Sequence, residues 1–170
     1  MKAIVFDEHG DLDVLQYRDV GTPEPGAGEV RVAVDACSLN YHDVFTRRGM
    51  PGIKTPLPMI PGCDAAGRID AVGHGVEGWS SGDRVLVDPV QWTDDGRIQM
   101  IGDTKWGGYA EYVIVDARQL IPLPAEVSAL DASCLPVAYG TAHRMMFTRG
   151  EVTADDTVFV LGASGGGGAG

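Results

Sequence analysis

The chain has 170 residues, of which 44 % are apolar, and its formal net charge at pH 7 is −11. This length and apolar content allow a sizeable core, so we expect a soluble globular protein with one domain and the beginning of another. The charge excludes nucleic acid and anionic membrane surfaces as expected partners, because phosphate binding depends on clustered Lys and Arg side chains.

The cellular compartment is indicated by the start of the chain and by its cysteines. Residues 1–3 lead directly into a strand-like run, and no apolar stretch approaches the ~20 residues of a membrane helix, so we expect neither a signal peptide nor a transmembrane segment. Cys37, Cys63 and Cys134 form no Cys-x-x-Cys pair, and their odd number argues against a disulfide scaffold. We therefore predict a cytoplasmic protein.

The excess of acidic residues leaves two interpretations open. Lysine occurs only at Lys2, Lys54 and Lys105, and Asp greatly outnumbers Glu. One interpretation is adaptation to salt, which screens the self-repulsion of the chain. The other is an ordinary acidic cytosolic enzyme.

Short apolar runs alternate with Gly and Pro up to about residue 125, which is typical of a β-rich domain with many turns. The runs with strand character lie at residues 3–6, 30–36, 67–72, 84–87 and 109–115. Two of them, 30–36 and 67–72, alternate apolar and charged positions, as half-buried strands do. The fold class predicted here is mainly β with some α, built on a compact, partly open barrel.

Helices are predicted in two places. Residues 41–45 follow Asn40, a good helix cap, and Asp43 is placed to return a hydrogen bond to the cap. Two consecutive helices are predicted between Ser128, a second cap residue, and Arg149, with Pro136 as the interruption.

The chain ends with an apolar run followed by glycines. Residues 157–161 are continuously apolar after Thr157, which is typical of a buried parallel strand, and residues 162–168 are rich in glycine. A flexible linker is the alternative interpretation of the glycines, and the apolar run directly before them makes it the weaker one.

Six short motifs give the chain a family resemblance along almost its whole length. They are Glu29-Val30, Asn40-Tyr41-His42-Asp43, Pro61-Gly62-Cys63-Asp64-Ala65-Ala66-Gly67, Gly82-Asp83-Arg84-Val85, Gly107-Gly108-Tyr109-Ala110-Glu111-Tyr112 and Gly140-Thr141-Ala142. In this order and spacing the chain resembles the medium-chain dehydrogenase/reductase superfamily, most closely its quinone oxidoreductase-like branch. Each motif is weak alone, and their common register makes the resemblance specific.

The resemblance implies a domain organisation and a cofactor. It implies a GroES-like barrel over residues 1–125, then, over 126–170, connecting helices and the first strand and glycine-rich turn of a truncated Rossmann domain. The active site is expected in the cleft between the two domains. NADPH or NADH is the implied cofactor, and the choice between them depends on a residue ~20 positions beyond the turn. Backbone N–H groups of the turn are expected to bind its pyrophosphate, at Ala163, Gly165, Gly166 and Gly168.

The same resemblance bears on metal binding. The positions that correspond to the catalytic zinc ligands of related alcohol dehydrogenases are Asn40, Cys63 and Val137, and only the cysteine binds zinc well. Residues 88–106, where the structural zinc loop falls, contain no Cys. We therefore expect no zinc. The alternative is a site rebuilt from neighbouring side chains, namely Cys37, His42, Cys63 and Asp64.

Without a metal, hydride transfer to a carbonyl needs hydrogen-bond donors or a protonated group near the substrate oxygen. The candidate catalytic residues are Asn40, Tyr41, His42 and, by resemblance, Thr141 beside the nicotinamide. Each also has a purely structural interpretation. Asn40 is then only a helix cap, Tyr41 and His42 are solvent-facing helix residues, and the Thr141 hydroxyl bonds to its own backbone. Arg47 and Arg48 are candidates to bind a phosphate group of the cofactor, and the alternative is that both are exposed to solvent.

The predicted function is an NAD(P)H-dependent, zinc-independent oxidoreductase that acts on a quinone, enone or related carbonyl or alcohol. We expect the complete protein to be a homodimer or homotetramer with a small-molecule substrate, and the fragment to be inactive alone. One alternative is a zinc alcohol dehydrogenase with altered ligands. Another is a non-catalytic GroES-like binding or assembly module, against which an exposed strand at 157–161 argues.

Overall fold

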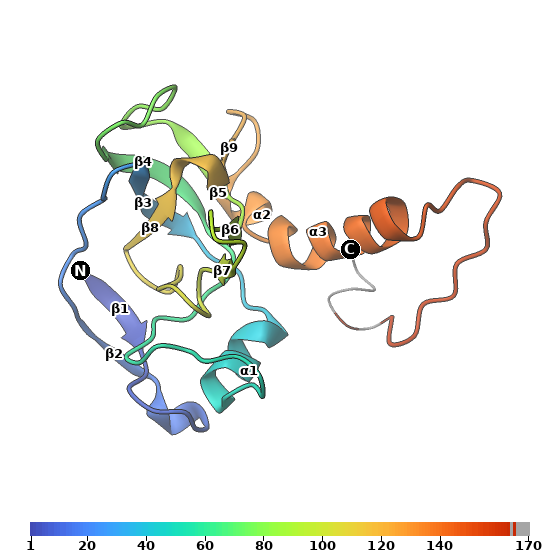
Figure 1. Ribbon diagram of the computed structural model, residues 1–170, viewed down its shortest axis with the longest axis horizontal. Coiled ribbons are helices and arrows are strands. Elements are labelled where there is room, and N and C mark those ends of the chain that lie inside the picture. Colours follow the sequence, from blue (N-terminus) through green and yellow to red (C-terminus); the bar gives the residue numbers. More distant parts are fainter. Residues whose placement is uncertain (164, 166–170) are drawn as a thin grey trace.

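The computed structural model describes residues 1–163 and 165 (Figure 1). Its helices and strands follow in chain order: β1 (Lys2–Val5), η1 (Leu12–Val14), β2 (Gln16–Asp19), β3 (Glu29–Ala36), α1 (Tyr41–Arg48), β4 (Ala66–Val72), β5 (Arg84–Val87), β6 (Val90–Trp92), β7 (Ile98–Met100), β8 (Tyr112–Asp116), η2 (Ala117–Gln119), β9 (Leu120–Pro122), α2 (Ala129–Ala132), η3 (Leu135–Tyr139), α3 (Gly140–His143) and η4 (Arg144–Arg149).

The main sheet has five antiparallel strands in the order β8-β3-β4-β5-β9. Two small ribbons, β1-β2 and β6-β7, pair separately. Single bridges, Ala3 to Ala110 and Phe6 to Met59, attach the first ribbon to the segments around the sheet. The sheet curves without closing (Figure 1), which confirms the predicted partly open β-barrel.

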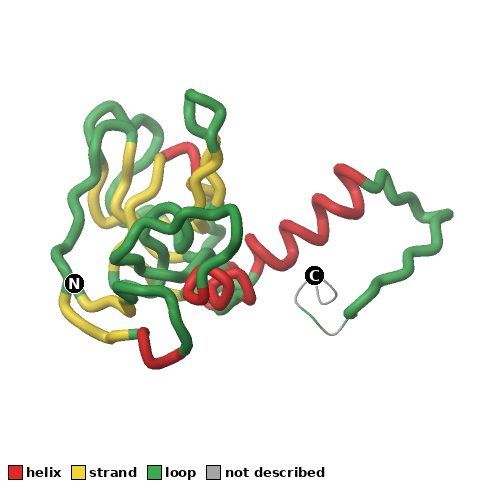
Figure 2. The backbone as a smooth tube through the Cα atoms, turned by 60° about the horizontal axis from the view of Figure 1, so that its bottom comes forward, coloured by secondary structure: helices red, strands yellow, loops and turns green. Residues whose placement is uncertain are grey.

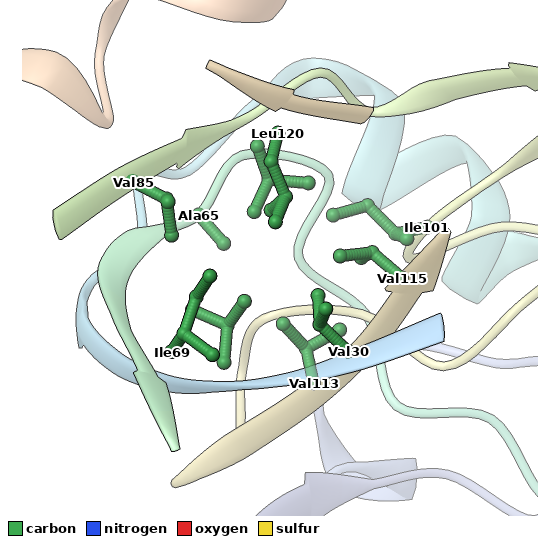
Figure 3. Close-up of a cluster of buried hydrophobic side chains, with 10 residues drawn as sticks. Val30, Ala65, Ile69, Val85, Ile101, Val113, Val115 and Leu120 are labelled. Carbon is green, nitrogen blue, oxygen red and sulfur yellow. The ribbon is translucent and has the colours of Figure 1, made fainter. Parts of the chain in front are cut away.

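The core lies on the concave side of this sheet, where alternate side chains of neighbouring strands meet (Figure 3). Val30 pairs with Val115 and Val32 with Val113 across β3 and β8, and all four side chains are at most 1 % exposed. Burying one such side chain contributes roughly 1.5–3 kcal/mol. The period-two pattern of β3 therefore acts through burial, with apolar positions inside and charged positions outside.

The predicted strands correspond to β1, β3, β4, β5 and β8, the last of which begins at Tyr112. Sequence analysis missed β2, β9 and the β6-β7 hairpin. In β2 three of four side chains are exposed, so no apolar alternation marks it. Strand β9 has three residues and ends at Pro122, on the sheet edge where proline is tolerated.

Two helical segments follow the sheet, as predicted. Ser128 caps α2 by accepting a hydrogen bond from the backbone N–H of Asp131 at 3.0 Å. From residue 135 to residue 149, η3, α3 and η4 form one continuous helical rod with wide turns at both ends and Pro136 in its first turn. Figure 2 shows this rod, hereafter the C-terminal helix, extending away from the sheet.

The buried parallel strand predicted at residues 157–161 is not formed. Val158 and Val160 are 45 % and 47 % exposed, and Phe159 and Leu161 are each 84 % exposed. Among the described residues no strand pairs with this run. A parallel strand is stable only between neighbouring strands and under covering helices, so its apolar residues alone do not create it.

We expect the melting temperature to rise as NaCl is increased from about 10 mM to about 1 M, over which the Debye length falls from about 30 Å to about 3 Å. The reason is the net charge of −11. Ion pairs such as Lys2–Asp19, with side chains 45 % and 75 % exposed, contribute little and therefore offer little opposing effect. Calorimetric scans in NaCl test this, and a flat or falling profile contradicts adaptation to salt.

Candidate functional site

The side chain of Asp43, near the start of α1, is a buried hub of hydrogen bonds. Its Oδ1 accepts from the backbone N–H groups of Gly62 and Cys63 and from the Cys63 thiol, at 3.1, 3.2 and 3.2 Å. Its Oδ2 accepts from the backbone N–H of Asn40 at 2.8 Å, the predicted capping bond, and from the Tyr109 hydroxyl at 3.0 Å. The carboxylate thus fixes α1 against two loops.

Gly62 permits this arrangement because of its backbone. Its φ is +101°, a region that L side chains rarely adopt, and a Cβ here would lie 2.6 Å from the ring of Tyr109. The glycine turns the backbone so that two successive N–H groups point at Asp43.

A second buried carboxylate, that of Asp64, joins three separate segments. Its Oδ2 accepts from the Ser38 hydroxyl and from the Asn40 carboxamide, both at 2.8 Å, and its Oδ1 accepts from the backbone N–H of Val137 at 3.1 Å. The residue is fully buried. Burial raises the pKa of the Asp64 carboxyl, while the hydrogen bonds from Asn40 and Ser38 oppose that shift. Asp64 therefore ties the loop before α1 to the first turn of the C-terminal helix.

The imidazole of His42 pairs with Asp103, from a loop distant in sequence. Nε2 lies 3.1 Å from Asp103 Oδ2, and the two side chains are 21 % and 7 % exposed. This hydrogen bond raises the pKa of His42, more than burial lowers it, and the charge of Asp43 adds to the increase. The other oxygen, Asp103 Oδ1, is buried and has no hydrogen-bond partner in the described part of the chain.

The remaining candidate residues lie in different surroundings. Tyr41 is 73 % exposed and packs against Phe45, with the ring centroids 5.3 Å apart. Thr141 is exposed on the C-terminal helix, four residues beyond Val137. The Asp64 hydrogen bonds thus bring Asn40 to the helix that carries Thr141, whereas no hydrogen bond among residues 1–163 joins Tyr41 to them.

The two arginines proposed for a cofactor phosphate differ from each other. Arg47 is only 5 % exposed, and its Nε is buried without a partner among the described residues. Arg48 is exposed and pairs with Asp11 at 3.1 Å. The Arg47 side chain is therefore buried, whereas that of Arg48 is exposed and paired with Asp11.

The three positions that correspond to zinc ligands do not fit a zinc ion. The Asn40 carboxamide donates to Asp64, and Val137 has no ligating atom in its side chain. The Cys63 thiol donates to Asp43, and burial raises its pKa, which opposes formation of the thiolate that binds zinc. Within residues 1–163 and 165, no three His, Cys, Asp or Glu side chains converge on a possible metal position, the rebuilt set of neighbours included.

The glycine-rich turn is described in part. Ala163 and Gly165 are exposed, and the Gly165 N–H donates to the Gly162 carbonyl at 3.0 Å, closing a turn in which Gly162 has φ +71°. A Cβ at Gly162 would meet no atom within 4 Å. Gly166 and Gly168 lie outside the described residues.

A hollow of about 640 Å³ runs beside Thr141, hereafter the hairpin groove. One side is formed by β6 and β7 and the other by the C-terminal helix, and the two lie next to each other in Figure 1. Its volume lies within the range of small-molecule sites.

Sequence analysis missed several of these roles, Asp103 and Ser38 among them, and it gave Tyr109 none. Asp43 was predicted only as a cap, and Asp64 only as a possible ligand. A usable signal exists for Asp64, since a carboxylate directly before the small apolar pair Ala65-Ala66 is expected to need partners once buried.

The alcohol dehydrogenase GroES-like domain family matches residues 26–125. Quinone oxidoreductase of Lama guanicoe is 36 % identical over 167 residues, which are 98 % of this chain and 46 % of that protein. A putative alcohol dehydrogenase from Sinorhizobium meliloti has a TM-score of 0.90 at 36 % identity, over 99 % of this chain and 52 % of that one. The cobalt- and zinc-bound thermostable alcohol dehydrogenase from Pyrobaculum aerophilum has a TM-score of 0.89 at 32 % identity, over 99 % and 54 %.

The chain therefore belongs to the alcohol dehydrogenase GroES-like domain family, within the medium-chain dehydrogenase/reductase superfamily. It spans about half the length of the curated relatives that it matches. Within the described residues, no helix combines the length and apolar character that crossing a membrane requires.

Proposed function

We propose that this chain forms the substrate-side part of an NAD(P)H-dependent, zinc-independent oxidoreductase that transfers hydride to or from a quinone, enone or related carbonyl. The observation that carries the proposal is the alignment of 98 % of the chain with a quinone oxidoreductase. Supporting it, Asn40 and Cys63 at the zinc positions donate hydrogen bonds to Asp64 and Asp43.

The proposal includes a domain boundary, a cellular compartment and an oligomeric state. Residues 1–125 form the GroES-like domain, and residues 126–170 begin the nucleotide-binding domain with its glycine-rich turn. The complete protein is a cytoplasmic homodimer or homotetramer with a small-molecule substrate. The family match, which ends at residue 125, supports the boundary.

When bound, reduced nicotinamide supplies a hydride and is oxidised. The acceptor takes the hydride at carbon and one proton at its oxygen or at the carbon beside the carbonyl, so the reaction consumes one proton in all. His42 is the proton source in our proposal, because Asp103 keeps its imidazole protonated to higher pH than usual. Asn40 is held in place by Asp64, and Tyr41 and Thr141 are hydroxyl donors at the edge of the site.

Replacement of His42 by glutamine is expected to lower kcat/KM for quinone reduction about 100-fold, the lower limit for a general acid. The assay uses the reading frame continued beyond Gly170, with NADH and NADPH as donors. In the unchanged protein kcat/KM falls as pH rises through the raised pKa of His42, since only the imidazolium donates.

Asp103→Asn is the matched control, because it leaves the imidazole and removes the charge that raises its pKa. The falling limb of the pH profile then moves to lower pH, which loss of structure alone does not produce. An unchanged profile in both variants rejects His42 as the proton donor.

A further inference from the structure

The β6-β7 hairpin presents an apolar face to the hairpin groove. Its side chains alternate, and the four on one face, Val90, Trp92, Ile98 and Met100, all line the hollow. Gln91 lies on the opposite face, where its Nε2 donates to Asp116 Oδ2 at 2.9 Å. The period-two pattern of the hairpin therefore places its apolar side on the groove.

The C-terminal helix supplies the facing wall with one stripe of residues. Val137, Thr141, Arg144 and Thr148 line the groove at spacings of four, three and four, so they share one helix face. Gly140 joins them, and a Cβ there would come no closer than 3.9 Å to a neighbouring atom. Three side chains of this wall, Thr141, Arg144 and Thr148, are polar, whereas the hairpin wall is apolar.

The hairpin exposes apolar side chains to solvent. Trp92 and Ile98 are direct partners across the two strands, and they are 63 % and 54 % exposed. A two-stranded hairpin of such short strands has little stability of its own. Across the groove, the Arg144 backbone N–H donates within the helix, whereas its guanidinium has no hydrogen bond or ion pair among the described residues and so has donors to offer.

We propose that the hairpin groove binds the ring system of a fused-ring quinone, which makes the Trp92–Ile98 pair the determinant of substrate class in the proposed oxidoreductase. This inference rests on the proposed function. The flat ring lies against Trp92 and Ile98, as aromatic pairs prefer, and its carbonyl oxygen accepts from Thr141 or Arg144. The volume of about 640 Å³ suits a small molecule of this kind.

Tryptophan fluorescence provides a direct binding test on the 170-residue chain, with 1,4-naphthoquinone as the probe. The chain has three tryptophans, and Trp92 is the one that lines the groove. We expect saturable quenching without a change in fluorescence lifetime, which distinguishes a complex from collisions. Trp92→Phe removes most of it. Trp106→Phe, the matched control, retains it, because the Trp106 indole donates to the Pro58 carbonyl elsewhere.

Ile98→Asp keeps the Trp92 reporter and places a charge on the apolar wall, so the Kd for naphthoquinone is expected to rise at least about tenfold. Circular dichroism confirms that the variant folds. Purely collisional quenching, equal quenching in the Trp92 and Trp106 variants, or an unchanged Kd in Ile98→Asp overturns the inference.

Turnover by the continued reading frame separates this inference from the proposed function. Ile98→Asp is expected to raise KM for naphthoquinone far more than KM for 2-cyclohexenone, a single non-aromatic ring. Reduction of both compounds with unchanged KM values rejects the groove and leaves the function standing. Binding of naphthoquinone that depends on Trp92, without any hydride transfer, rejects the function and leaves the groove standing.

Discussion

Replacing Asp43 with alanine is expected to remove a large share of the chain's folding stability. The carboxylate accepts five hydrogen bonds, from Asn40, Gly62, Tyr109 and twice from Cys63, and the residue is 5 % exposed. Each buried donor that loses its acceptor without regaining water costs about 1–3 kcal/mol, so losing several at once is expected to cost at least about 3–5 kcal/mol. Typical domains are stable by about 5–15 kcal/mol, so this loss is a large share of the total.

Urea unfolding followed by circular dichroism measures the change. Asp35→Ala is the control, since its carboxylate lies on the outer side of β3, 48 % exposed, and its substitution is expected to stay within about 0.5 kcal/mol. Asp43→Asn keeps one acceptor oxygen and should fall between the two. A loss of less than about 1 kcal/mol in Asp43→Ala contradicts the role of the Asp43 carboxylate in fixing α1 against the two loops.

The second large effect is expected at Asp64. Its replacement by alanine is expected to cost about 3 kcal/mol and to loosen the C-terminal helix from the sheet. The N–H of Val137 lies in the first turn of that helix, where backbone donors have no partner inside the helix, and Asp64 supplies one from outside. A negative charge at a helix N-terminus is also favoured by the helix dipole.

Hydrogen exchange resolves this effect by position. In Asp64→Ala the amide of Val137 loses protection, while the core amide of Val113 on β8 changes only as much as global stability does. Ser38→Ala, which removes one donor to the same carboxylate, is expected to cost about 1 kcal/mol. Asp155→Ala, an exposed carboxylate, serves as the neutral control. Equal protection of the Val137 amide in all variants contradicts the proposed role of Asp64 in holding the C-terminal helix.

The sequence predicts the sheet well, because each of its long strands carries its own alternation. In β3 the buried valines Val30 and Val32 are separated by Arg31, and the alternation alone places both valines on one face and the arginine on the other. Strand β2 and the run at residues 157–161 show the limit. The first is a strand without an apolar face, and the second is an apolar run without a neighbouring strand.

The site divides in the same way between local and distant contacts. The bond from Asn40 to Asp43 spans three residues and is visible in the sequence as a capping pattern. The bonds from the Val137 N–H to Asp64 and between His42 and Asp103 join residues 73 and 61 positions apart. Such pairs depend on the packing of the whole sheet, and no spacing rule within one segment predicts them.

Zinc independence is tested most directly by measuring metal content and turnover on one preparation of the continued reading frame. After dialysis against a chelator, elemental analysis is expected to find only traces of zinc, and reduction of naphthoquinone by NADH or NADPH is expected to continue at an unchanged rate. The physical reason is that Asn40 and Cys63 donate hydrogen bonds to Asp64 and Asp43, and that burial raises the pKa of the Cys63 thiol. Stoichiometric zinc, or activity that chelation abolishes and zinc restores, contradicts this account.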